Sequence, residues 1–275
     1  MSRRQGAPVR LQIDSRTLLD SLERHRGRLV GSLEGLTATE WCAPSRCAGW
    51  SVADVVGHLR WGTEVGLELL RRVEQGCGDR LFEGFDPRMT PQSTLEPLRG
   101  RDPAEHLAAV REGTATLLAA ARDLAARGVK DEADTPLGWL PWPLAVNHLL
   151  WDSWLHERDV LVPLGGAPDP DPVEVRLVGS YQLMLLGAML ARVGMRCRVD
   201  LRLEGAGGGA YRLTVGDEVV IDHPEEPAAA GGCIAGDAVT VIEAMSGRGD
   251  LATHAQGPQP MLRSAGLLAS RLAGV

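Results

Sequence analysis

Apolar residues recur at helical spacing through the first part of the chain. This period predicts four long helices, over residues 13–33, 51–73, 102–124 and 141–162. Residues 37–40 and 51–54 have the pattern of a capping box, and Pro103 follows Asp102 at a first helical position. Four such helices joined by loops predict a four-helix bundle.

The period changes in the last third of the chain, where apolar and polar residues alternate. Alternation over 197–204, 211–215 and 219–221, with a glycine-rich turn at 205–209, predicts a meander of three strands. Helical spacing returns at 237–245 and at 260–272. This order of elements predicts a small α+β domain.

The break between the two patterns divides the chain. All seven tryptophans lie between Trp41 and Trp154, and residues 163–172 have the proline and glycine density of a connector. We therefore expect an α+β protein with a helical domain over 11–165, followed by a small α+β domain over 174–275.

Composition and charge exclude several classes of protein. A formal net charge of −7 argues against a general nucleic-acid binder. The most apolar stretch, 177–193, is interrupted by Gln182 and Arg192, which favours a buried helix over a membrane span. The polar, basic start lacks the apolar core of a signal peptide, and the five cysteines contain no C-x-x-C pair. We therefore expect a cytoplasmic protein with reduced thiols and no nucleic-acid or membrane partner.

The last predicted helix of the first domain carries four residues that are able to bind a metal or a proton. At about 100° per residue, His148, Asp152, His156 and Asp159 fall within a stripe about 80° wide, set in an apolar face. Burying ionisable groups costs several kcal/mol unless they are paired or bound to a metal. Asp152 and His156 are one turn apart, so both can point at a common ion.

A third ligand comes from the second predicted helix, where His58 flanks the apolar stripe. Two histidines and one carboxylate are the three-ligand set of a catalytic zinc site, which leaves a fourth position for water or substrate. A structural histidine beside the core is the alternative interpretation of His58. Glu105 and His106 open the third predicted helix, and we expect both to be exposed.

Two segments resemble the signatures of a known family. Residues 41–59, with Gly49-Trp50-Ser51-Val52 and His58-Leu59, closely resemble the second-helix signature of the mycothiol-dependent maleylpyruvate isomerase family, within the DinB-like helical superfamily. Residues 152–160 resemble its fourth-helix signature.

The resemblance implies a DinB-like four-helix bundle in which His58, Asp152 and His156 bind a divalent metal, usually zinc. The isomerase has a glutamate where this chain has Asp152, which is one methylene shorter. Metal binding survives this change because both carboxylates ligate zinc, but the identity of the substrate stays open.

The later α+β part resembles the family's C-terminal domain, which has a sterol-carrier-like shape. Arg248 lies in this part and is a candidate catalytic residue that holds a substrate carboxylate, or else a solvated loop arginine. Two roles stay open in the first domain. His148 is a replacement ligand, a group that supports a ligand, or a solvated neighbour. Asp159 orients a neighbour, caps the helix or binds the metal.

The family implies a metal-dependent enzyme that uses a low-molecular-weight thiol, mycothiol or a similar one. The thiolate attacks an electrophilic small molecule, and the reaction ends in S-transfer or in isomerisation. No cysteine lies within either signature helix, so we expect no protein nucleophile. A zinc-water hydrolase and a non-catalytic small-molecule-binding protein are the alternatives. The electrophile, the thiol, the metal and the oligomeric state stay open.

Overall fold

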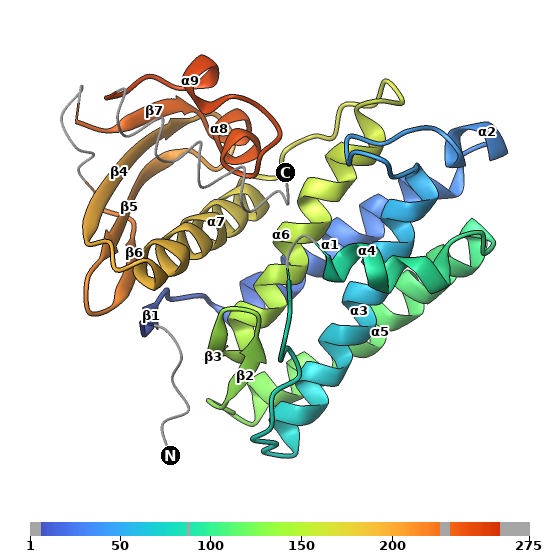
Figure 1. The fold of residues 1–275 in the computed structure, drawn as a ribbon, viewed down its shortest axis with the longest axis horizontal. Helices are drawn as coiled ribbons and strands as arrows, with labels where there is room; N and C mark the ends of the chain where they lie inside the picture. The colour runs from blue at the N-terminus through green and yellow to red at the C-terminus, as the bar shows by residue number, and fades with distance from the viewer. Residues whose placement is uncertain (1–6, 87–88, 226–231, 259–275) are drawn as a thin grey trace. The chain divides into compact units, whose positions relative to one another are not determined.

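The computed structural model describes residues 7–86, 89–225 and 232–258. The chain divides into two compact units, one mainly helical and one containing a five-stranded sheet (Figure 1). The helical unit comprises Asp14–Pro136 and Leu140–Asp169, and the sheet unit comprises Met1–Ile13, Leu137–Trp139 and Pro170–Val275. The predicted fold class is confirmed. The expected domain limits, 11–165 and 174–275, stay a prediction that expression of either segment alone would test.

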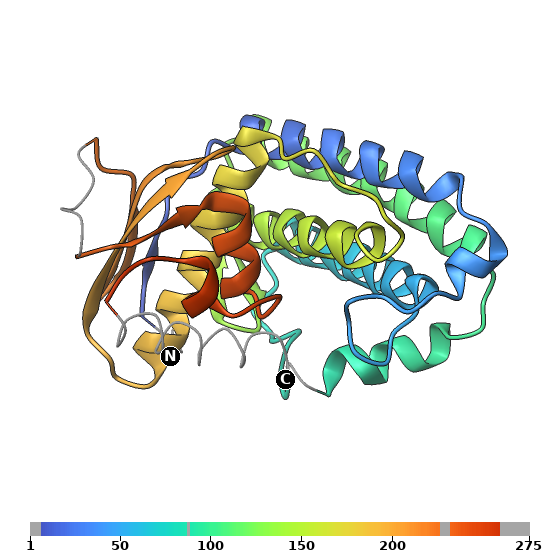
Figure 2. The same cartoon turned by 90° about the horizontal axis from the view of Figure 1, so that it is seen from above.

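Four long helices make up most of the helical unit: α1 (Ser15–Glu34), α3 (Val52–Glu74), α5 (Pro103–Ala126) and α6 (Trp142–Leu161). Each overlaps one of the four predicted helices. Both α1 and α3 pack against α5 and α6, so the four helices lie side by side (Figure 2). Part of the core between them is built from Leu29, Leu33, Val55, Val56 and Leu59. The helices form because their apolar stripes can be buried only against one another.

Reciprocal side-chain caps fix where two helices of this unit begin. The Ser51 hydroxyl accepts a hydrogen bond from the Asp54 amide, and the Asp54 carboxylate accepts one from the Ser51 amide. The same reciprocal pattern, between Thr37 and Glu40, opens the short helix α2 (Ala38–Trp41). Both predicted capping boxes are therefore confirmed. The box at Ser51 sets the start of α3, and with it the direction in which His58, roughly two turns later, projects.

Short elements connect the long helices, and none of them was predicted. They are α4 (Thr90–Leu95), the 3-10 turn η1 (Glu96–Leu98) and a hairpin of β2 (Glu132–Thr135) and β3 (Gly138–Pro141). The expectation that His106 is exposed is wrong, because its side chain is buried. A Cβ placed on Gly57 of α3 would lie 3.6 Å from the His106 ring and 3.2 Å from Leu95 of α4, so these elements pack together here.

The sheet of the other unit has the strand order β1 (Val9–Arg10), β6 (Val219–Asp222), β5 (Gly209–Val215), β4 (Cys197–Glu204) and β7 (Ile234–Asp237). The three central strands pair antiparallel and confirm the predicted meander. The two edge strands pair parallel to their neighbours and were not predicted. Both are short, so neither shows a period of its own.

Helix α7 (Pro172–Arg192) packs on β5 and β6 (Figure 2). By length and composition alone it could cross a membrane, but 72% of its most apolar window is buried within the protein. The prediction of a buried core helix is confirmed. Helix α8 (Ala238–Met245) is also as predicted, and α9 (Leu251–His254) follows it. The predicted helix 260–272 lies outside the described residues. All five cysteines are free.

Candidate metal centre

Three predicted ligands come together between α3 and α6. Asp152 Oδ1 lies 3.5 Å from His58 Nε2 and 3.4 Å from His156 Nε2. The three ligand atoms all lie within 4.8 Å of one another. Their side chains are only 8–14% exposed, so the cluster opens narrowly to solvent. Asp152 and His156 share a face because they are one turn apart on α6, and α3 supplies His58 across the helix interface.

The pKa values of Asp152 and His156 are strongly shifted. Burial alone would raise the pKa of Asp152, but the neighbouring His156 and His58 hold it well below its ordinary value. Burial alone would lower the pKa of His156, but the charge of Asp152 and hydrogen bonds to Asp152 and Asp159 raise it well above its ordinary value. Without a metal, the imidazolium of His156 and the carboxylate of Asp152 therefore form a buried ion pair.

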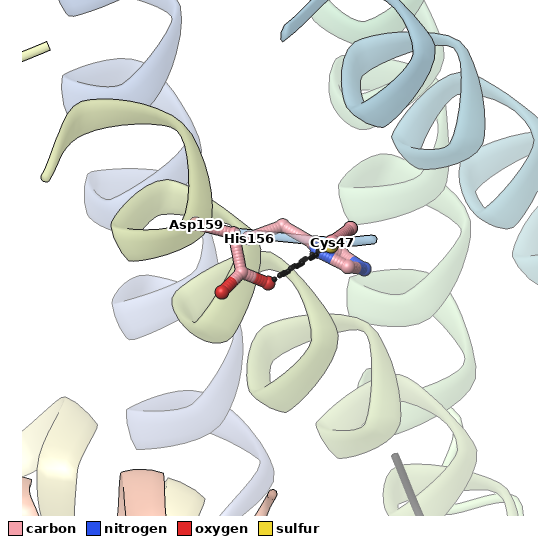
Figure 3. Close-up of side chains that lie close together, drawn as sticks. All are labelled: Cys47, His156 and Asp159. Carbon is pink, nitrogen blue, oxygen red and sulfur yellow. Dashed lines mark hydrogen bonds and ion pairs between the residues drawn. The ribbon is translucent and has the colours of Figure 1, made fainter. Parts of the chain in front are cut away.

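The second ring nitrogen of His156 faces a separate set of partners. His156 Nδ1 lies 3.0 Å from Asp159 Oδ2 and 3.7 Å from Cys47 Sγ, and the Cys47 thiol donates to Asp159 at 3.3 Å (Figure 3). Asp159 Oδ1 also pairs with Arg46 Nε at 3.6 Å, and the Arg46 amide donates to the Asp159 carbonyl at 2.9 Å. Asp159 thus contacts His156, and it also links the Cys47 loop to α6.

The geometry fits a divalent metal. Ligand atoms about 2.0 Å from a tetrahedral zinc lie about 3.3 Å apart, close to the two separations around Asp152. A carboxylate that accepts from the other nitrogen of a ligand histidine is the usual support of such a site, and Asp159 provides it. His58 lacks this support, because its buried Nδ1 has no hydrogen-bond partner. Its ring lies instead near Trp50 and Trp61, with centroids 5.3 and 5.7 Å away.

Two predicted site residues remain, His148 and Arg248. His148 is partly buried beside Trp151, with ring centroids 5.4 Å apart, and burial lowers its pKa. It belongs to neither candidate ligand group of the described residues. Arg248 lies in the sheet unit, just after α8, where its Nη1 donates to the Ser246 carbonyl at 2.7 Å. Its role toward a substrate carboxylate stays a prediction.

Cys47 is the site residue that sequence reasoning missed. Cys47 lies within residues 41–59, which resemble the second-helix signature, two residues before Gly49. It precedes the helix and lies in a loop. The loop brings its thiol to residues 109 and 112 positions later in the chain. With His156 and Asp159 it forms a second group of metal-ligand type, which shares His156 with the first. The family signature includes this loop through Gly49 and Trp50, but no local period in the sequence predicts which residues a loop contacts.

Residues 22–161, just over half of the chain, match the family model described as the mycothiol maleylpyruvate isomerase N-terminal domain. The chain belongs to the mycothiol maleylpyruvate isomerase family. The family is one of enzymes, and the matched segment contains His58, Asp152 and His156. Among curated proteins, none matches the chain.

Two solved structures share the fold. One is the mycothiol-dependent maleylpyruvate isomerase, with a TM-score of 0.64 at 15% identity, and the other is a mutant of that enzyme with alanine in place of a histidine, with a TM-score of 0.63 at 14% identity. Each match covers 89% of this chain and 92% of the other. At such identities the likeness shows the fold, and the coverage extends it well beyond the helical segment of the family model.

Proposed function

We propose that this chain is a divalent-metal-dependent enzyme that uses a low-molecular-weight thiol, mycothiol or a similar one. The thiol is transferred to an electrophilic small molecule, or is added to it and lost again so that the molecule isomerises. Membership of the mycothiol maleylpyruvate isomerase family supports the thiol and the reaction type. The observation that carries the metal dependence is the convergence of His58, Asp152 and His156 on one point.

His58, Asp152 and His156 would hold the ion, and zinc suits two imidazoles and a carboxylate. A divalent ion bound there would lower the pKa of a coordinated thiol, so that the thiolate forms near neutral pH. Three protein ligands leave the remaining position for that thiol.

The protein's own side chains set the protonation of the site. In the neutral ring that ligation requires, Asp159 holds the proton at His156 Nδ1, which leaves Nε2 as the ligand atom. The rings of Trp50 and Trp61 lie near His58, whose Nδ1 is buried without a hydrogen-bond partner. The Cys47 thiol points at Asp159 and therefore donates a hydrogen bond to it.

The test is thiol-dependent turnover by the zinc-loaded full chain. Maleylpyruvate is the first electrophile to try, because it is the substrate in the name of the similar enzyme, and mycothiol is the first thiol. We expect loss of the electrophile only when thiol is present, and no activity in His58→Ala. The surface variant His254→Ala, which removes an exposed histidine, should keep full activity.

Two results would contradict the proposal. Turnover that persists when thiol is withheld would indicate a zinc-water hydrolase instead. Zinc-loaded protein that binds electrophiles but converts none of them, with or without thiol, would indicate a binding protein.

A further inference from the structure

Among the described residues, one cationic side chain in the interior of the helical bundle has a buried N–H group without a hydrogen-bond acceptor. Arg26 lies in the middle of the apolar stripe of α1, on the same face as Leu22, Leu29 and Leu33. Its side chain is 3% exposed, and its Nη1 is buried without a hydrogen-bond acceptor. A buried guanidinium is normally paired because the loss of hydration is costly, so an unpaired one requires an explanation.

Other arginines of the same bundle show what a satisfied guanidinium looks like here. Arg158 is equally buried, but its Nη1 donates to the Trp154 carbonyl at 3.2 Å and to Glu157 at 3.4 Å. Its guanidinium also stacks 3.5 Å above the Trp154 ring. Arg28, two residues after Arg26, pairs with Glu157 at 3.3 Å. Arg158, the equally buried arginine, therefore has acceptors for its N–H groups, and Arg28, which is partly exposed, has a carboxylate.

Helix α1, which carries Arg26, packs on α6, which carries Asp152 and His156, and the charge of Asp152 acts on Arg26. Burial lowers its pKa to about 10, and the charge of Asp152 is the one that counteracts this effect. At neutral pH Arg26 therefore keeps its positive charge. Among the described residues no ion pair joins Arg26 to Asp152, whose Oδ1 faces His58 and His156 instead. A divalent ion bound by the three ligands would neutralise Asp152 further. The positive charge near Arg26 would then increase.

We propose that Arg26 is an anion-binding residue that takes a carboxylate of the small molecule bound at the metal centre. This inference rests on the proposed function and assigns the residue that holds a carboxylate of the bound molecule. A planar guanidinium with free N–H groups matches a carboxylate through two parallel hydrogen bonds. The carboxylate belongs either to the electrophile or to the thiol, since each of these molecules would be bound at the metal centre.

The probe is succinate, titrated by calorimetry into the zinc-loaded full chain. Arg26→Met should weaken succinate binding at least about tenfold, because a charge-assisted bidentate pair is lost. The control Arg24→Met, which removes an exposed arginine from the same helix, should bind succinate as the wild type does. Dimethyl succinate, which lacks the charges, should not bind. Arg26→Lys keeps the charge without the planar fork and should fall between the wild type and Arg26→Met.

Stability separates a binding role from a structural one. Removing an unpaired buried charge should leave the melting temperature of Arg26→Met at or above that of the wild type, with zinc content unchanged. A lower melting temperature together with loss of zinc would make Arg26 a structural counter-charge to Asp152 and overturn the inference. Wild type that does not bind succinate, or Arg26→Met and Arg26→Lys that both bind it as tightly as the wild type, would also overturn it.

Separate measurements identify the molecule that carries the carboxylate and test the proposed function. If the electrophile carries the carboxylate, succinate competes with the electrophile and Arg26→Lys raises its KM; if the thiol carries it, both effects appear on the thiol. A zinc-loaded wild-type chain that shows no thiol-dependent turnover would refute the proposed function alone, provided that succinate still binds and Arg26→Met still weakens this binding.

Discussion

Asp159 is where the metal centre can be weakened without touching a ligand. The variant Asp159→Asn keeps the size of the side chain and removes its charge. In the wild type this carboxylate faces His156 Nδ1 at 3.0 Å, the Cys47 thiol at 3.3 Å and Arg46 Nε at 3.6 Å. The carboxylate is fully buried, so none of these partners can exchange it for water. We expect the asparagine to orient His156 less firmly and zinc to bind more weakly.

Two effects of opposite sign determine the size of the loss. Partners that orient a ligand histidine are worth about 10–100-fold in metal affinity, or about 1.4–2.7 kcal/mol. Asp159 also helps to raise the pKa of His156, and the proton on that ring competes with the metal. Its removal eases this competition at neutral pH. The loss should therefore be about tenfold at pH 7 and approach about 100-fold at alkaline pH.

The assay is competition for zinc between the full chain and a chromophoric chelator at the two pH values. Glu157→Gln is the matched control, because Glu157 is also buried on α6 but pairs with Arg28 and Arg158, away from the ligands. It should lower the melting temperature and leave zinc affinity unchanged. Equal zinc affinity of Asp159→Asn and wild type at both pH values would refute the reasoning, and so would an equal loss in Glu157→Gln.

Three further predictions concern the nucleophile, the packing and the protons of the site. Cys47→Ser keeps a hydroxyl to donate to Asp159 and should retain thiol-dependent turnover, whereas a protein nucleophile at Cys47 would make this variant inactive. Gly66→Val should lower the free energy of unfolding by about 1–3 kcal/mol in a denaturant titration. A Cβ at Gly66 would lie 2.6 Å from a leucine methyl of α6 and 2.8 Å from one of α5, whereas Gly27, with nothing within 4 Å, should accept valine without loss. Zinc uptake at pH 7 should release about one proton, because the raised pKa of His156 keeps it protonated in the metal-free chain; calorimetry in two buffers that finds no release would refute this. The same raised pKa implies that the metal-free chain loses stability as the pH rises through it.

Sequence periodicity predicted the parts of this fold that are stabilised locally. The long helices have an apolar stripe, and the caps at Ser51 and Asp102 mark where two of them begin. The central strands alternate because one face of the sheet is covered by α7. Strand β1 has only two residues and pairs with β6, some 210 positions later, so no local pattern could reveal it.

The sequence predicted the residues of the candidate site that lie on one helix, but not all of the contacts between elements. Asp152 and His156 follow from helical spacing alone, because one helix presents both. His58 was a candidate third ligand because it flanks the apolar stripe of the second predicted helix, and the family resemblance supported its pairing with Asp152 and His156. The positions of Cys47 and Arg26 depend on a loop and on a third helix, and their partners, or the lack of one, emerge only when the chain is folded.

The central claim is that His58, Asp152 and His156 bind a metal, and metal content tests it most directly. Elemental mass spectrometry would be carried out on the untagged full chain beside the double variant His58→Ala/His156→Ala. We expect about one zinc or similar ion per chain in the wild type and none in the variant, with both proteins folded by circular dichroism. Folded wild-type protein that contains no metal and takes up neither added zinc nor added nickel would contradict the account.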